Sequence, residues 1–256
     1  MKMNAARYLY CVTQGKKKMT FGKIGIDEKE VFTIPYKDLC SVVQDCPAQP
    51  YKSENQEQVK SWIVIHEKVV EMVWKRRNTV LPFGFDTIVR SVQEKDAEDV
   101  LKEWMKDAYG ILTQKLARLR ERAEYGVQVL WDPKIIGRRL ALGNEDLKKL
   151  SAESNSRSQG IAYLLQQKAE NLMRKDLERE AEKFSREFFL KMNKYADEIN
   201  VEKTKKSEEG RQMLINLSCL CVRDRVKDLG DELERLNAQD GFFVRFTGPW
   251  PPYSFV

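Results

Sequence analysis

The sequence predicts an α+β protein with two domains, the C-terminal one a modified ferredoxin-like module with long amphipathic helices. Its 256 residues exceed the usual size of one domain. Short β-branched and aromatic runs alternate with helical patterns, and one long apolar stripe follows the period of a helix. The expected domains are residues 1–90, an N-terminal α+β domain with strands and one helix, and residues 91–256. The second domain would carry a charged helical insertion at about 134–208 and a proline and aromatic tail at 248–256.

The first domain is expected to be a small sheet covered by a helix. β-Branched and aromatic runs predict three strands, and a segment rich in Pro, Ser and Asn predicts a loop before the helix. The predicted elements are strands at 8–13, 31–34 and 39–43, a loop at 46–58 and a helix whose apolar positions run from Val59 to Val73. The segment VLPFGF, Val80–Phe85, returns to β character. Its Pro82 and Gly84 predict an edge or bulged strand.

The second domain shows the alternation of strands and helices that is typical of a ferredoxin-like module. The predicted elements are a long helix at 93–122, a strand at 125–131, a charged helix with its apolar stripe at Ile161–Ile199, a strand at 213–222, a helix at 226–236 and a strand at 242–246. The stripe advances by about 3.8 residues per step. This exceeds the 3.5 of a left-handed coiled coil, so the pattern favours a long amphipathic helix over a heptad zipper.

Charge and cysteine content exclude several classes of protein. The 45 Lys and Arg against 39 Asp and Glu leave a net charge of +6, which is only mildly basic. No apolar run approaches the roughly 18–20 residues needed to span a bilayer, and the N-terminus lacks a signal-peptide core. Five cysteines, an odd number without a CxxC pair, argue against disulfides or zinc. We therefore expect a soluble cytoplasmic protein with reduced thiols.

Few residues suggest catalysis. The sole histidine, His66, follows Trp62 by one turn on the apolar face of its helix, so a structural role is favoured over that of a base. The chain has no GxSxG, P-loop, GxGxxG or HExxH motif. We expect no enzyme, no cofactor and no metal. The remaining enzymatic alternative would use a nucleophile among Cys11, Cys40 and Cys46.

Three basic clusters keep a nucleic-acid-binding ferredoxin-like protein as the alternative function. They are Lys16–Lys18, Lys75–Arg77 and the group Arg118, Arg120 and Arg122. Lysine and arginine bind phosphates. Acidic residues accompany each cluster in the sequence, and no RNP-like motif is visible, so nucleic-acid binding is the less favoured hypothesis.

The tail is the most unusual segment. Its last nine residues contain three prolines and three aromatic residues, whereas a chain end is normally polar and frayed. Either the tail folds back on its own domain as a clasp, or it inserts into a partner. The clasp is the favoured interpretation.

These C-terminal residues resemble a known family. The segment GPWPPYSFV, Gly248–Val256, is similar to the ending of gas vesicle accessory proteins of the GvpL/GvpF family. Further similar pieces follow in the family's order: YLYCVT near the N-terminus, the helix with His66, VLPFGF, and SQGIAYL before the charged helix. One departure is Phe85-Asp86, where the family commonly has a Phe-Gly pair. The resemblance covers nearly the whole chain.

The resemblance implies a non-enzymatic accessory or structural protein that supports the assembly of gas vesicles, the hollow protein shells that give microbes buoyancy. It implies a location at the gas vesicle in the cytoplasm. Its expected partners are the small hydrophobic major shell protein and other accessory proteins, with no nucleic acid and no membrane. Whether the chain is of the F or the L type stays open.

Contact with the shell protein is expected at three places. The candidate residues are Phe184, Phe188, Phe189 and Met192 on the charged helix, Leu81 and Phe83 near the edge strand, and Trp250, Tyr253 and Phe255 in the tail. Aromatic side chains and methionine suit varied apolar partners. The alternative is that the helix stripe covers the ferredoxin-like sheet, and this is favoured for most of its residues.

Overall fold

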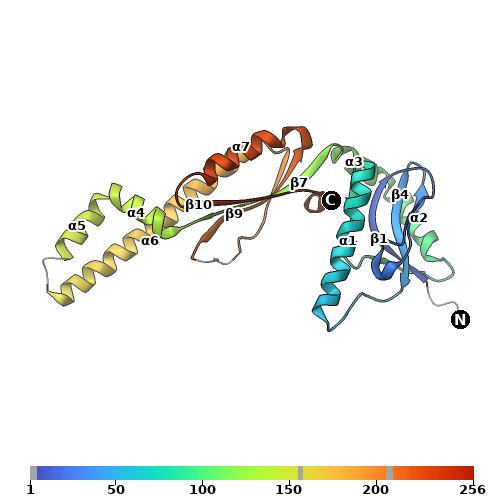
Figure 1. Cartoon of the computed structure of the whole chain (residues 1–256), viewed down its shortest axis with the longest axis horizontal. Coiled ribbons are helices and arrows are strands. Elements are labelled where there is room, and N and C mark those ends of the chain that lie inside the picture. The colour runs from blue at the N-terminus through green and yellow to red at the C-terminus, as the bar shows by residue number, and fades with distance from the viewer. Residues whose placement is uncertain (1–4, 155–157, 206–209) are drawn as a thin grey trace. The chain divides into compact units, whose positions relative to one another are not determined.

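The computed structural model describes residues 5–154, 158–205 and 210–256, and it confirms the α+β class (Figure 1). The chain divides into two compact units. Unit 1 extends to Glu124 and also includes Pro249–Val256, whereas unit 2 comprises Tyr125–Gly248. Within the described ranges, the structure contains no helix with the length and apolar character needed to cross a membrane.

The sheet of unit 1 has the order β2-β3-β4-β1-β5, and β6 pairs with another part of β1. Its strands are β1 (Ala5–Gln14), β2 (Thr20–Gly22), β3 (Val31–Tyr36), β4 (Leu39–Pro47), β5 (Val80–Pro82) and β6 (Ile88–Val89). The pairs β1–β4, β3–β4 and β1–β5 are antiparallel. Residues 8–12 of β1 are buried on both faces, because helices cover both sides of this strand. This explains their uninterrupted apolar and aromatic character.

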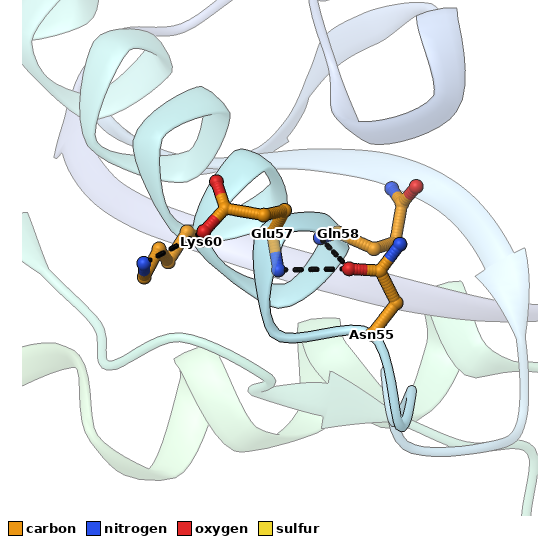
Figure 2. A network of polar contacts seen from close by, with 4 residues as sticks. All are labelled: Asn55, Glu57, Gln58 and Lys60. Atoms are coloured by element: carbon orange, nitrogen blue, oxygen red, sulfur yellow. Dashed lines mark hydrogen bonds and ion pairs between the residues drawn. The ribbon is translucent and has the colours of Figure 1, made fainter.

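Helix α1 (Gln56–Arg77) covers one face of this sheet and begins before the first apolar position of its stripe. Asn55 caps it, since its side-chain oxygen accepts hydrogen bonds from the backbone N–H groups of Glu57 at 3.0 Å and Gln58 at 3.4 Å (Figure 2). Lys60 forms an ion pair with Glu57 one turn into the helix. The helix ends at Asn78, whose φ of 61° is left-handed and whose N–H bonds to the Trp74 carbonyl.

The single helix expected at 93–122 is two helices, α2 (Ala97–Asp107) and α3 (Tyr109–Arg118). They meet at Ala108, whose φ of −88° and ψ of 0° interrupt the helical conformation. Both helices pack on the sheet of unit 1, with α2 against β3 and β1 and α3 against β5 and β1. The expected boundary at residue 90 therefore lies inside unit 1, because the apolar faces of α2 and α3 complete the core of the first sheet.

Unit 2 contains a sheet with the order β10-β7-β9-β8. Its elements are β7 (Arg122–Trp131), α4 (Pro133–Gly143), α5 (Glu145–Ser154), α6 (Gln159–Met192), β8 (Glu198–Val201), β9 (Gln212–Val222), α7 (Val226–Asn237) and β10 (Phe242–Trp250). If α4 to α6 count as one helical connection, the chain runs strand, helix, strand, strand, helix, strand. This succession and strand order are those of the ferredoxin-like module that the sequence predicted. The described residues also form short 3₁₀ turns, namely η1 (Ile26–Glu28), η2 (Arg223–Arg225) and η3 (Tyr253–Phe255).

The charged segment at 134–208 differs from the expected insertion. Its last described element, β8, is a strand of the sheet, and α6 packs against β9. The segment therefore supplies part of the ferredoxin-like module itself. Helices α4 and α5 pack on α6 instead, and Gly137 allows the close approach, since a Cβ there would lie 3.4 Å from the sulfur of Met173.

Candidate partner-binding surfaces

The aromatic end of α6 lies between the helix and the sheet of unit 2. Phe188 and Met192 are buried. The Phe184 ring stacks on Phe188 with 5.7 Å between centroids and packs on Phe242 of β10 at 4.8 Å. The fourth candidate residue on this helix, Phe189, is half-buried, and no contact with another aromatic ring is seen for it among the described residues. Phe184, Phe188 and Met192 thus serve the core of unit 2.

The segment VLPFGF forms the edge of the sheet of unit 1, but its apolar side chains point inward. Leu81 in β5 is fully buried. Phe83 is half-buried and packs edge-on against Trp104 of α2, with 5.7 Å between ring centroids. Its N–H also bonds to the Tyr10 carbonyl at 2.9 Å. Neither candidate residue offers an open apolar surface to a partner.

His66 joins α1 to this same segment. Its Nε2 lies 3.0 Å from the Phe83 carbonyl oxygen and its Nδ1 lies 2.8 Å from the Tyr8 hydroxyl. A carbonyl only accepts, so Nε2 carries the proton and Nδ1 accepts from Tyr8. The Tyr8 oxygen in turn accepts from the Asp86 N–H at 3.1 Å. Burial lowers the pKa of His66 to about 4, which keeps the ring neutral at pH 7. With both nitrogens engaged, His66 is structural.

A second group of polar side chains extends this network beneath α1. The Tyr10 hydroxyl donates to the side-chain oxygen of Gln44 at 2.5 Å, and the Gln44 amide donates to the Tyr51 hydroxyl at 3.1 Å. The Tyr51 N–H donates to the Asp86 carboxylate at 2.9 Å. Burial raises the pKa of Tyr51 to about 12, so the phenol stays protonated. These side chains thus satisfy one another's hydrogen bonds.

The C-terminal tail docks in unit 1. Glu124 accepts hydrogen bonds from the Ser254 N–H at 2.8 Å and from the Ser254 hydroxyl at 2.6 Å. Arg118 donates to the Phe255 carbonyl, and the Phe255 ring is buried. The tail thus belongs to unit 1 and not to the expected domain 91–256, because its anchors Arg118 and Glu124 are both residues of unit 1. Trp250 remains 48% exposed.

Tyr253, the remaining aromatic candidate in the tail, is more exposed than Phe255 and less exposed than Trp250. Tyr253 is 36% exposed as a whole residue. Desolvation raises the pKa of its hydroxyl, as do the negative charges of Glu67 and Glu124. The tail therefore acts as a clasp within unit 1 while part of its aromatic surface stays accessible.

Sequence reasoning missed an exposed apolar surface on the helices outside the sheet of unit 2. We call it the hairpin surface; it comprises Ile161, Tyr163 and Leu164 of α6, exposed by 47%, 61% and 66%. A signal was present, since Ile161–Leu165 has five consecutive apolar residues. One face of a helix cannot bury such a run, so part of it must face outward.

The cysteines do not form a reactive site. All five are free and buried. Burial raises the pKa of Cys46 to about 11 and also raises those of Cys11 and Cys40, so thiols predominate over nucleophilic thiolates at pH 7. Within the described ranges, no cluster of three or more His, Cys, Asp or Glu residues is arranged to hold a metal ion.

The central strands of the unit 2 sheet do not favour RNA recognition. Val127 and Val129 of β7 are buried, and the alternate residues Gly126 and Gln128 face the other side. There the Gln128 amide donates to the Asn216 side chain of β9 at 3.2 Å. RNA-binding modules of this topology stack bases on aromatic residues of these two strands, and the face of β7 and β9 that carries Gln128 and Asn216 has no aromatic residue.

Comparisons with known proteins agree with this fold. The family model described as gas vesicle synthesis protein GvpL/GvpF matches residues 6–256. Gas vesicle protein L1 of Halobacterium salinarum is 27% identical over 98% of this chain and 90% of its own length. Gas vesicle protein F of Dolichospermum flosaquae is 21% identical over 99% of this chain and 98% of its own.

Solved structures show the same architecture. The crystal structure of GvpF from Anabaena sp. PCC7120 superposes with a TM-score of 0.74 at 20% identity, and that of GvpF from Microcystis aeruginosa with 0.68 at 18%. Each comparison covers 98% of this chain and 98% of the other. With the family model matching nearly the whole sequence, the chain belongs to the GvpL/GvpF family of gas vesicle synthesis proteins, and its role is that of a gas vesicle accessory protein.

Proposed function

We propose that this accessory protein binds the small hydrophobic major shell protein during gas vesicle assembly and that the hairpin surface makes the contact. The observation that carries the proposal is the exposure of Tyr163 and Leu164. Both lie in SQGIAYL, a segment that is similar to the corresponding segment of the family. Neither side chain is part of a hydrophobic core. Exposed apolar side chains gathered on one structural feature are typical of interaction sites.

The physical need for such a surface follows from the partner. A shell subunit that polymerises through apolar surfaces aggregates when they are exposed to water. An accessory protein lowers this tendency by covering them until assembly. Two helices packed on a third provide a rigid support for apolar side chains, which reduces the entropy lost on binding.

The other candidate residues are divided by their burial. Four of them are buried, so they stabilise the fold and do not contact a partner directly: Phe188, Met192, Leu81 and Phe255. Phe184 and Phe83 are packed against neighbouring rings. Phe189, Tyr253 and Trp250 retain accessible surface and belong to the proposal as secondary contacts.

A pull-down of the full chain co-expressed with the major shell protein tests the contact. The double variant Ile161→Ser and Leu164→Ser removes two exposed apolar side chains, and we expect it to lower the captured shell protein about tenfold. The matched control, Glu182→Ser with Lys183→Ser, changes two exposed polar residues of the same helix and should capture as much as the unsubstituted chain. Circular dichroism verifies that each variant is folded.

A third variant separates the hairpin surface from the tail. Trp250→Ser removes the most exposed aromatic ring of the tail and should leave most of the capture intact. If Trp250→Ser abolishes capture while the folded double variant retains it, the contact lies in the tail. If the unsubstituted chain captures no shell protein, the proposed partner is wrong.

A further inference from the structure

Three basic clusters that are far apart in the sequence converge at one end of unit 1. Arg77, at the end of α1, lies with its guanidinium 2.7 Å from the sulfur of Met19 in the loop after β1. The Arg120 guanidinium, after α3, lies 3.4 Å from the side-chain oxygen of Gln14 at the end of β1. The turn between β3 and β4 joins them, since the Gly15 N–H bonds to the Asp38 carbonyl at 2.8 Å.

We call this region the basic end; it comprises Lys16, Lys17, Lys18, Lys37, Arg76, Arg77 and Arg120. All are exposed except Arg77, which is half-buried. Two carboxylates, Asp38 and Glu121, lie on the same segments as the seven cations, so positive charge predominates. The Tyr109 hydroxyl and, to a smaller extent, Lys16 and Lys37 lower the pKa of Asp38, so this carboxylate offsets part of the charge. The C-termini of α1 and α3 contribute about half a negative charge each, too little to balance the cations.

Five of the seven cations of the basic end lie against neutral groups. The Arg76 guanidinium lies over the Phe21 ring at 5.6 Å, and the Lys37 ammonium lies over the Tyr109 ring at 4.3 Å. Lys18 lies over Phe32 at 5.2 Å, in a pocket that Glu30, Asp45 and Glu98 also line, so its charge is offset more than that of the other cations. Across residues 5–154, 158–205 and 210–256, none of the seven is joined to a carboxylate in a described ion pair. A ring or thioether fixes a cation without cancelling its charge, so the charge stays available to a partner.

We propose that the basic end binds a carboxylate-rich segment of a protein partner. Complementary charge identifies the partner as acidic, and the covered rings favour protein over nucleic acid. Single-stranded nucleic acids gain affinity by stacking bases on open aromatic faces. Here cations occupy the faces of Phe21 and Tyr109. This surface is separate from the hairpin surface, and the inference does not depend on binding of the shell protein.

Fluorescence anisotropy with a labelled oligoglutamate peptide tests the inference on the full chain. The test variant combines Lys17→Ser, Arg76→Ser and Arg120→Ser, one exposed cation from each of the three joined segments. The control combines Arg138→Ser, Lys168→Ser and Arg186→Ser, which removes the same charge and the same residue types from unit 2. We expect the test variant to weaken binding about tenfold at low salt, and the control to change it little. Raising the salt should weaken binding of the unsubstituted chain.

Three results would overturn the inference. The first is the absence of peptide binding at low salt. The second is an equal loss of affinity in the two folded variants, which would mean that only overall charge matters. The third is tighter binding of a labelled oligothymidylate or a DNA duplex of matched charge than of the peptide, which would identify nucleic acid as the class of partner.

Discussion

At the scale of single residues, His66 makes the stability of unit 1 depend on pH. Its folded pKa of about 4 lies below the ordinary 6.5, so between these values the unfolded chain takes up a proton that the folded chain excludes. The stabilising contribution is therefore complete above pH 6.5 and is lost as the pH falls toward 4. We expect the free energy of unfolding to fall by about 2 kcal/mol between pH 7 and pH 5 from this group alone.

Urea unfolding of the native chain and of His66→Gln at both pH values isolates the effect, since the variant lacks the titrating ring. An equal pH dependence in both proteins would contradict the assignment.

The same residue shows what could be predicted from the sequence. Its position one turn after Trp62 indicated a structural histidine, and the two hydrogen bonds agree with that interpretation. Its partners could not be predicted, because Tyr8 lies in β1 and Phe83 directly follows β5, and no local pattern specifies how these strands pair. The departure at Asp86 also has a local explanation. Its φ of 68° is left-handed, a conformation that glycine adopts freely and aspartate tolerates better than most residues.

At the scale of elements, α6 allows a direct comparison of core and surface. Phe188 is buried between α6 and the sheet, whereas its neighbour Phe189 is half-buried. We expect Phe188→Ala to lower the free energy of unfolding of unit 2 by about 3–5 kcal/mol, because it leaves a cavity. Phe189→Ala should cost about 1 kcal/mol. Urea unfolding of the two variants provides the measurement, and equal losses would mean that the two rings are packed alike.

Elements with strong periodicity could be predicted, and short ones could not. The long strands and the helices α1, α6 and α7 carry enough apolar positions to fix their type. The strands β2 and β8 have three and four residues, and pairing with a neighbour creates them more than propensity does. The apolar stripe of α6 indicated which face of the helix is buried. It did not indicate whether that face packs on the sheet of unit 2 or on a partner protein, because both surfaces are covered by the same apolar residue types. The sequence pattern does not distinguish the buried Phe188 from the exposed Leu164, because their difference depends on which part of α6 packs on the sheet.

At the scale of the whole molecule, the chain enters unit 1 twice, first with its N-terminal residues and again with its last eight. Sequence order suggested instead that the tail belongs with the C-terminal domain. Truncation after Gly248 removes the buried Phe255 and the hydrogen bonds to Glu124 and Arg118. We expect amide hydrogen exchange to accelerate in unit 1, most of all near these two residues, because they lose their partners and part of the core is exposed. Exchange in α7 of unit 2 should stay unchanged. The double variant Glu124→Gln and Ser254→Ala weakens the polar contacts alone and should produce a smaller acceleration in the same segments. If truncation instead accelerates exchange mainly in α7, the tail stabilises unit 2, and its assignment to unit 1 is wrong.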